Sequence, residues 1–166
     1  MAWMRRVDYD ILSELAKNAK ISDRQLAKKI GVSQPTVTRR RARLEREVIG
    51  SYTLVPRWGK IGYTLFAITL VKVRNTETEK WTTIRKRISE WLMKHPNIIM
   101  SSNCSGNEIN SFMISIHKSF GDYDDLLLEM RTELGDVIDG VQTLLVNLAG
   151  KGVLKPLDLK YLADAK

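Results

Sequence analysis

The sequence has few of the residues from which disulfides, metal sites and catalytic centres are built. Cys104 is the single cysteine among 166 residues, so no disulfide can form within the chain, and this composition suits a reducing cytoplasm. The two histidines, His95 and His117, lie far apart and have no metal-ligand spacing with Cys104. No combination of nucleophile, base and orienting group accompanies them. We therefore expect no metal, no cofactor and no enzymatic activity.

Long apolar runs are also missing. No stretch approaches the roughly 20 apolar residues that a membrane span requires. The first residues, MAWMRRVDYDIL, contain two arginines but lack the apolar segment of a signal peptide. Gly31, Gly50 and Gly59 stand singly, so they do not form a Gly-rich phosphate-binding loop. These absences predict a cytoplasmic protein without a membrane partner.

Positive charge, in contrast, is abundant and unevenly distributed. Residues 1–60 contain 14 Lys and Arg against 6 Asp and Glu, whereas residues 61–166 contain 13 of each, so the first third carries the whole net charge of +8. A basic module joined to a neutral one indicates that the basic module binds nucleic acid. An anionic membrane surface is the competing partner, but it would require an amphipathic helix with exposed Trp, Phe or Leu.

The basic segment has the pattern of three short helices. Asp8 is the expected N-cap of the first helix, whose apolar residues between Ile11 and Ala19 have helical spacing. Ser22 and Gln25 predict a capping box at the start of the second helix. Gly31 can adopt the left-handed conformation that ends this helix. Two helices joined by a short glycine-containing turn are typical of a helix-turn-helix.

The third helix distinguishes a helix-turn-helix from an ordinary three-helix bundle. Ser33 is its expected N-cap, and Pro35 falls in the first turn, where the missing N–H does no harm. Short polar and long cationic side chains crowd this helix, whereas a solvated face usually alternates Glu with Lys or Arg. In a major groove, the N-terminal residues of such a helix face base edges and its arginines face guanine or phosphate. The residues expected to contact DNA are Ser22, Ser33, Gln34, Pro35, Thr36, Thr38, Arg39, Arg40 and Arg43.

After the third helix, residues 48–63 combine β-forming residues with three glycines and Pro56. This composition predicts a short wing-like strand, a turn and a linker. Arg57 and Lys60 either touch the DNA backbone as part of a wing or only keep the linker soluble.

The remaining sequence alternates strand and helix patterns. The expected elements are strands at 65–73, 98–105, 110–117 and 141–148, and helices at 77–94 and 122–134. The order βαββαβ predicts a ferredoxin-like α+β fold. Because two helices cover only one face of such a sheet, the apolar strands predict that the other face pairs with a second copy in a homodimer.

These patterns divide the chain into four parts. We expect a helix-turn-helix domain at 1–50, a wing or linker at 51–63, a ferredoxin-like dimerisation and effector-type domain at 64–150, and a tail at 151–166. The tail sequence is compatible with an edge strand, a helix packed on the dimer or a disordered segment.

Together the motifs resemble the leucine-responsive and asparagine-activated (Lrp/AsnC) transcription regulators across roughly residues 7–148. The resemblance rests on D-x-x-I-L-x-x-L from Asp8, S-x-x-x-L-A from Ser22, and I-G-V-S-x-x-T-V-x-x-R-x-x-x-L-E from Ile30. Shorter matches are G-Y-T at Gly62 and H-P-N-I at His95. Further short matches are Ser105-Gly106 and the I-D-G-V segment that ends at Val141.

This resemblance implies a bacterial or archaeal cytoplasmic regulator that binds double-stranded DNA. Such proteins are dimers or higher oligomers such as octamers, and an amino acid is a common effector. A dimer predicts a palindromic operator. The resemblance places the effector near the turn between the second and third strands, with Glu108 as the candidate carboxylate for its ammonium group. The implied effector-binding residues are Ser105, Gly106, Asn107, Glu108 and Asn110.

Two other functions stay open. The siroheme decarboxylases resemble the same two-domain pattern, but they are richer in His, Tyr and Arg around the second and third strands than the segment IIMSSNCSGNEINSFMISI. An architectural DNA-coating protein is the other alternative, because the charge pattern predicts affinity for DNA better than selectivity. The sequence identifies neither the operator, the effector nor the sign of regulation.

Overall fold

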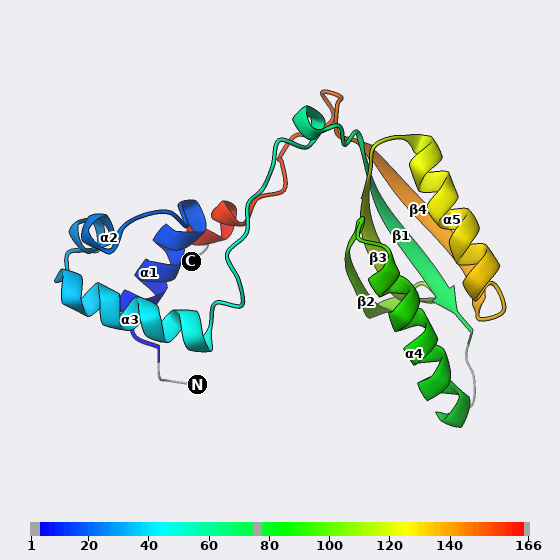
Figure 1. Cartoon of the computed structure of the whole chain (residues 1–166), viewed down its shortest axis with the longest axis horizontal. Coiled ribbons are helices and arrows are strands. Elements are labelled where there is room, and N and C mark those ends of the chain that lie inside the picture. The colour runs from blue at the N-terminus through cyan, green and yellow to red at the C-terminus, as the bar shows by residue number, and fades with distance from the viewer. Residues whose placement is uncertain (1–3, 75–77, 165–166) are drawn as a thin grey trace. The chain divides into compact units, whose positions relative to one another are not determined.

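A computed structural model describes residues 4–74 and 78–164 of the chain (Figure 1). The chain divides into two compact units, one comprising Met1–Val55 with Pro156–Lys166 and the other Pro56–Lys155. Across the described residues, no helix combines the length and apolarity needed to cross a membrane. Each unit has its own apolar core.

Three α-helices form the N-terminal part of the first unit, as the sequence predicts. They are α1 (Arg6–Lys17), α2 (Asp23–Ile30) and α3 (Gln34–Glu47). Their apolar stripes meet in one core because each stripe has helical spacing. The buried residues of this core are Ile11, Leu15, Ile21, Leu26, Ala27, Val37 and Leu44.

The expected caps of α2 and α3 are present. Ser22 Oγ accepts a hydrogen bond from the backbone N–H of Gln25 at 3.3 Å, and Gln25 Oε1 accepts one from the backbone N–H of Ser22 at 3.2 Å. Ser33 Oγ accepts from the backbone N–H of Thr36 at 3.4 Å. Gly31 ends α2 with φ +72°, a conformation that favours glycine. These local bonds fix the turn that separates α2 from α3.

The start of α1 corrects the sequence expectation, because Asp8 is not the N-cap. Arg5 occupies that position, and Asp8 is the third residue of the helix. Asp8 Oδ2 accepts a hydrogen bond from the backbone N–H of Arg5 at 2.7 Å. A carboxylate at the third helical position can satisfy the N–H of the cap residue, which is the second half of a capping box. The apolar periodicity alone did not locate the helix start.

The segment between α3 and the second unit also differs from expectation. The wing-like strand expected within residues 48–63 does not form, and the regular element of this segment is a short 3-10 helix, η1 (Trp58–Ile61). A lone extended segment needs a partner strand to satisfy its backbone groups. Three glycines and Pro56 further disfavour a strand here.

The second unit has the predicted ferredoxin-like α+β fold (Figure 1). Its elements are β1 (Leu65–Val73), α4 (Thr78–Lys94), β2 (Ile98–Gly106), β3 (Ile109–His117), α5 (Phe120–Leu134) and β4 (Ile138–Asn147). The strand order is β2-β3-β1-β4, and every neighbouring pair is antiparallel. The helix predicted at 77–94 corresponds to α4. Residue 77 of that prediction lies outside the described residues.

Both helices cover the same face of this sheet. Trp91 of α4 and Met130 of α5 share a core with Met113 of β3. Because side chains alternate along a strand, the residues next to Met113 point to the opposite face. That outer sheet face is apolar and contains Phe66, Ile68, Leu70, Phe112, Ile114, Leu144 and Val146.

The tail forms part of the first unit. A second short 3-10 helix, η2 (Leu159–Asp164), packs against α1 (Figure 1). Ser13 Oγ donates a hydrogen bond to the backbone carbonyl of Ala163 at 2.6 Å. Among the arrangements that the sequence leaves open for residues 151–166, the structure therefore has a short helix, although it lies on α1 of the same chain.

Candidate nucleic-acid interface

One face of α3 points away from the core of the first unit. Val37 and Leu44 are fully buried and define the inward side of the helix. At 100° per residue, Pro35, Arg39 and Arg46 lie on the opposite side. The outer face of α3 comprises the exposed residues Gln34, Pro35, Thr38, Arg39, Ala42 and Arg46.

Several residues expected to bind DNA also stabilise the helix ends. Ser22 and Ser33 are exposed N-caps of α2 and α3. Ser33 Oγ and Thr36 Oγ1 are 2.8 Å apart, and Thr36 is half-buried. Thr38 Oγ1 donates to Asp23 Oδ2 of α2 at 2.7 Å. The hydroxyl groups thus fix the first turns of α3, while Gln34, Pro35 and Arg39 extend from it.

The arginines of α3 fall into two groups. Arg39 is exposed on the outer face, whereas Arg40 and Arg43 bind Asp8 of α1. Arg40 Nη1 lies 3.0 Å from both carboxylate oxygens, and Arg43 Nη2 lies 2.9 Å from Oδ2. The spacing in the sequence predicts that Arg40 differs from Arg39. Arg40 is three residues after the buried Val37, so it lies on a neighbouring part of the helix surface, at the edge of the core.

Asp8 is completely buried, with 0% of its surface exposed. Burial alone would raise the pKa of its carboxyl group. The backbone N–H of Arg5 and the guanidinium groups of Arg40 and Arg43 outweigh burial and lower this pKa. The carboxylate is therefore charged, and it neutralises part of the positive charge of α3.

Beside this cluster, α3 carries a groove rich in arginine. It is lined by Arg5, Arg39, Arg40, Ala42, Arg43 and Arg46. Sequence reasoning missed Arg5 and Arg46. Arg46 follows Arg39 by seven residues, two helical turns, so a helical projection would have identified it. Arg5 precedes α1, and only the fold brings it to this groove.

Arg41 has a different environment from its neighbours. Its guanidinium group donates to the carbonyl of Ile21, to Asp23 and to Glu45 at 2.9–3.2 Å. Tyr52 also donates to Glu45 Oε1, at 2.7 Å. The Tyr52 hydroxyl and Arg41 together lower the pKa of Glu45. Arg41 therefore joins α3 to the start of α2 at the edge of the core.

The residues expected to bind an effector lie together in the β2–β3 hairpin. Asn107 and Glu108 form its turn with φ values of +48° and +64°. Lys72 Nζ lies 2.6 Å from Glu108 Oε2 and lowers the pKa of Glu108. Asn110 donates to the carbonyl of Val73 at 2.7 Å and accepts from its N–H at 2.8 Å. Two of the five candidates thus already have partners within the chain, while Ser105 and Gly106 remain exposed.

A small cavity lies next to this hairpin. Sequence reasoning did not identify Trp81, Arg85 and Ile88 of α4 or Asn103 of β2 as effector-binding residues. The lining residues are Val73, Trp81, Arg85, Ile88, Asn103, Asn110 and Ser111. Of the predicted effector residues, Asn110 alone is among them.

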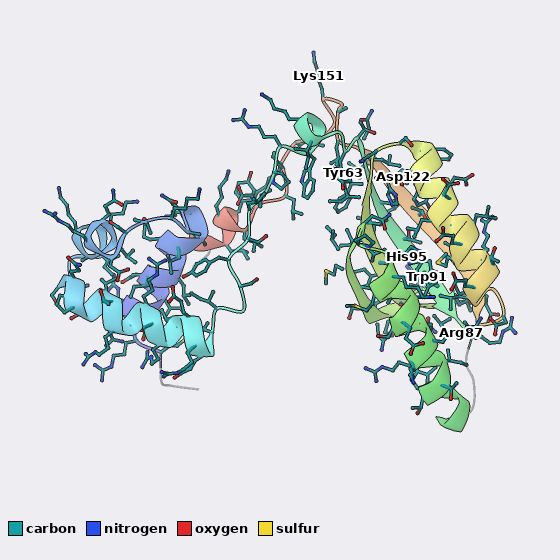
Figure 2. All side chains as sticks on the ribbon, in the orientation of Figure 1. Tyr63, Arg87, Trp91, His95, Asp122 and Lys151 are labelled. Carbon is teal, nitrogen blue, oxygen red and sulfur yellow. The ribbon has the colours of Figure 1, made fainter. Side chains whose placement is uncertain are left out.

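The two histidines lie in separate surroundings. His95 lies near the end of α4 (Figure 2). Its Nε2 is 2.7 Å from Oε2 of Glu129 in α5. His117 is buried, and its Nε2 is 2.8 Å from Ser115 Oγ. Within residues 4–74 and 78–164, no three His, Cys, Asp or Glu side chains gather in a way that would hold a metal ion.

Comparison with known proteins identifies the class of fold to which the chain belongs. A model described as winged helix-turn-helix DNA-binding matches residues 4–47. The crystal structure of an AsnC family regulator from Agrobacterium tumefaciens superposes with a TM-score of 0.77 at 21% identity, covering 96% of this chain and 99% of that one. A regulator from Neisseria meningitidis in complex with L-Met also superposes with a TM-score of 0.77, at 17% identity and with the same coverage. The fold is therefore that of a helix-turn-helix unit joined to a ferredoxin-like unit.

Curated relatives identify the regulators that the chain resembles. LrpC of Bacillus subtilis is 33% identical over 56% of this chain and 60% of its own length. The leucine-responsive regulatory protein of Rhizobium meliloti is 25% identical over 84% of this chain and 86% of its own length. The resemblance to the Lrp/AsnC transcription regulators is confirmed, and the chain is a relative of these proteins.

The extent of these matches differs. A regulator of Pyrococcus furiosus is 32% identical, but the alignment spans about half of that protein, 52%. The relatives that align over most of their length are 24–27% identical to this chain.

Proposed function

We propose that the protein is a sequence-specific, DNA-binding transcription regulator that acts in the cytoplasm as a homodimer. The observation that supports this most directly is the outer face of α3, which presents Gln34, Pro35, Thr38 and two arginines to solvent at the end of a helix-turn-helix. In a major groove, the first turn faces base edges and the arginines face guanine or phosphate. Ser22 and Ser33, at helix N-termini, are suited to contact phosphates.

The outer sheet face supports the homodimer. Leu144 is 62% exposed there, and it lies beside Ile68, which pairs on its other side with Ile114. Pairing of two such faces removes apolar surface from water, and a two-fold axis is the commonest symmetry for it. Two recognition helices then address half-sites of a palindrome about 34 Å apart, or a multiple of this distance.

A small effector belongs to the proposal as well. The Neisseria meningitidis neighbour is described as an L-Met complex, and amino acids are the effector class that the family resemblance implies. In this chain the β2–β3 hairpin and the cavity beside it offer amide and hydroxyl groups from Asn103 and Ser111, with Trp81 as an apolar wall. An effector bound there changes DNA affinity only if it binds one assembly state more tightly than another.

The deciding experiment compares two duplexes, the DNA upstream of the protein's own gene and an unrelated sequence of equal length. Binding is measured by fluorescence anisotropy over a series of salt concentrations. We expect both affinities to fall linearly with log salt, with the upstream DNA bound at least 100-fold more tightly.

Equal affinity for both duplexes would favour an architectural DNA-coating protein. Absence of binding at low salt would contradict the DNA hypothesis. The visible absorption spectrum of the purified protein would then test for a bound tetrapyrrole.

A further inference from the structure

The buried Asp8 cluster, formed by Asp8 with Arg5, Arg40 and Arg43, connects α1 to α3, the proposed recognition helix. Asp8 is 0% exposed, and the side chain of Arg40 is only 13% exposed. One carboxylate accepts hydrogen bonds from the backbone of Arg5 and from the side chains of Arg40 and Arg43. A buried charge is tolerated where it is paired and hydrogen-bonded in this way.

The cluster also determines which cations are available to a ligand. The guanidinium groups of Arg40 and Arg43 point at the buried carboxylate, so their charge is partly neutralised, although the Arg43 side chain is still 32% exposed. Arg39 and Arg46 line the same groove as Arg40 and Arg43 but do not bind Asp8, and Arg5 is exposed beside them. Arg46 pairs with Glu47 at the surface, and its side chain is 73% exposed.

We propose that Asp8 is a positioning residue for DNA binding, which ties Arg40 and Arg43 to α1 and leaves Arg5, Arg39 and Arg46 as the phosphate-binding cations. This rests on the proposed function and names the contacts of that same interface. Asp8 does not touch DNA in this arrangement. It fixes the rotation of α3 about its axis, and with it the direction in which Gln34 and Thr38 face.

The first test counts phosphate contacts in three variants, Arg39→Gln, Arg46→Gln and Arg40→Gln. Each neutralised phosphate contributes about 0.9 to the slope of log K against log salt. We expect Arg39→Gln and Arg46→Gln each to reduce the slope by about 0.9 on both duplexes. Arg40→Gln should leave the slope unchanged, because its amide keeps a donor for Asp8 while removing a charge that does not reach DNA.

The second test is Asp8→Asn, with Asp10→Asn as the matched control on the same helix. Both variants remove one negative charge, but Asp10 is partly exposed and Asp8 is fully buried. Asp8→Asn releases Arg40 and Arg43, so we expect a slope steeper by about 1–2. Because α3 is no longer held in one rotation, preference for the upstream DNA over the unrelated duplex should fall at least tenfold. Asp10→Asn should show neither change.

The outcomes separate the two proposals. If the unmodified protein binds no DNA, the proposed function fails. If it binds, but Arg40→Gln lowers the slope as much as Arg39→Gln, Arg40 contacts phosphate and the role of Asp8 is overturned. Equal behaviour of Asp8→Asn and Asp10→Asn would also overturn it. Circular dichroism checks that Asp8→Asn is folded, and if it is not, the three arginine variants decide.

Discussion

At the scale of single residues, Asp8 and His117 are both fully buried, but Asp8 is negatively charged and His117 is neutral. Asp8 is surrounded by cations, so its negative charge is retained. His117 has mainly neutral partners: Asn97 Nδ2 lies 3.3 Å from Nδ1, and Ser115 Oγ lies 2.8 Å from Nε2. Burial lowers the pKa of His117, and the nearby Asp122 opposes this only in part. The imidazole is therefore neutral in the folded protein.

A neutral buried histidine makes the second unit sensitive to acid. The unfolded state binds a proton near the ordinary pKa of about 6.5, whereas the folded state resists it. The contribution of neutral His117 to the free energy of unfolding is therefore complete above about pH 6.5. It is lost as the pH falls from this value towards the lower pKa of the folded state. We expect the Tm to decrease between pH 7.5 and pH 5, as measured by circular dichroism. The variant His117→Gln should show a weaker pH dependence over this range, and an equal dependence would contradict the assignment.

The residue scale also shows where sequence reasoning succeeded and where it failed. The caps Ser22 and Ser33 were predictable because a cap depends on residues within one helical turn. Asp8 was predicted to be the N-cap because the apolar periodicity does not locate the helix start, and its pairing with Arg40 and Arg43 was missed because they lie more than 30 residues away, on α3. Long-range ion pairs leave no local pattern in the sequence.

At the scale of elements, the β2–β3 hairpin has an unfavourable residue at its turn. A two-residue turn with positive φ at both positions favours Asn followed by Gly. Here Glu108 takes the second position with φ +64°, which costs a side chain with a Cβ about 1–2 kcal/mol. The exposed ion pair with Lys72 offsets only part of this cost.

We therefore expect Glu108→Gly to stabilise the second unit by roughly 1 kcal/mol. Chemical denaturation would measure this as a higher midpoint with an unchanged slope. Asn107→Gly is the matched control, because asparagine already tolerates the left-handed conformation, so its effect should be smaller. A loss of stability in Glu108→Gly would show that the ion pair outweighs the backbone strain.

Elements with strong periodicity were predicted well, and the order βαββαβ followed from their patterns. The structure of residues 48–63 was not predicted correctly, because β-forming residues make a strand only where a partner strand is present. Local composition does not contain that information.

At the scale of the whole molecule, the outer sheet face is the basis for assembly. We expect the protein to be a dimer in light scattering and Leu144→Glu to be a monomer, because a buried charge at the sheet interface is costly. Leu128→Glu on α5 is the matched control, since Leu128 is 63% exposed but lies on the helical layer. The monomeric variant should bind the upstream DNA at least tenfold more weakly. If Leu144→Glu stays dimeric, the dimer forms elsewhere.

The tail offers another test at this scale. Removal of residues 156–166 eliminates η2 and the hydrogen bond from Ser13, which contributes about 1 kcal/mol. A loss of this size lowers the Tm of a small unit by about 4–8 °C. Differential scanning calorimetry would show a lower transition for the first unit and an unchanged one for the second. Two unchanged transitions would mean that η2 contributes nothing to the helix-turn-helix.

The position of η2 has a consequence for biosynthesis. The first unit is assembled from two stretches of chain, and the whole second unit lies between them in the sequence. During translation, α1, α2 and α3 leave the ribosome early, but the segment that packs on α1 follows only after the sheet has been synthesised. The first unit therefore cannot reach its complete fold until the end of the chain has been made, whereas the second unit is built from one continuous stretch.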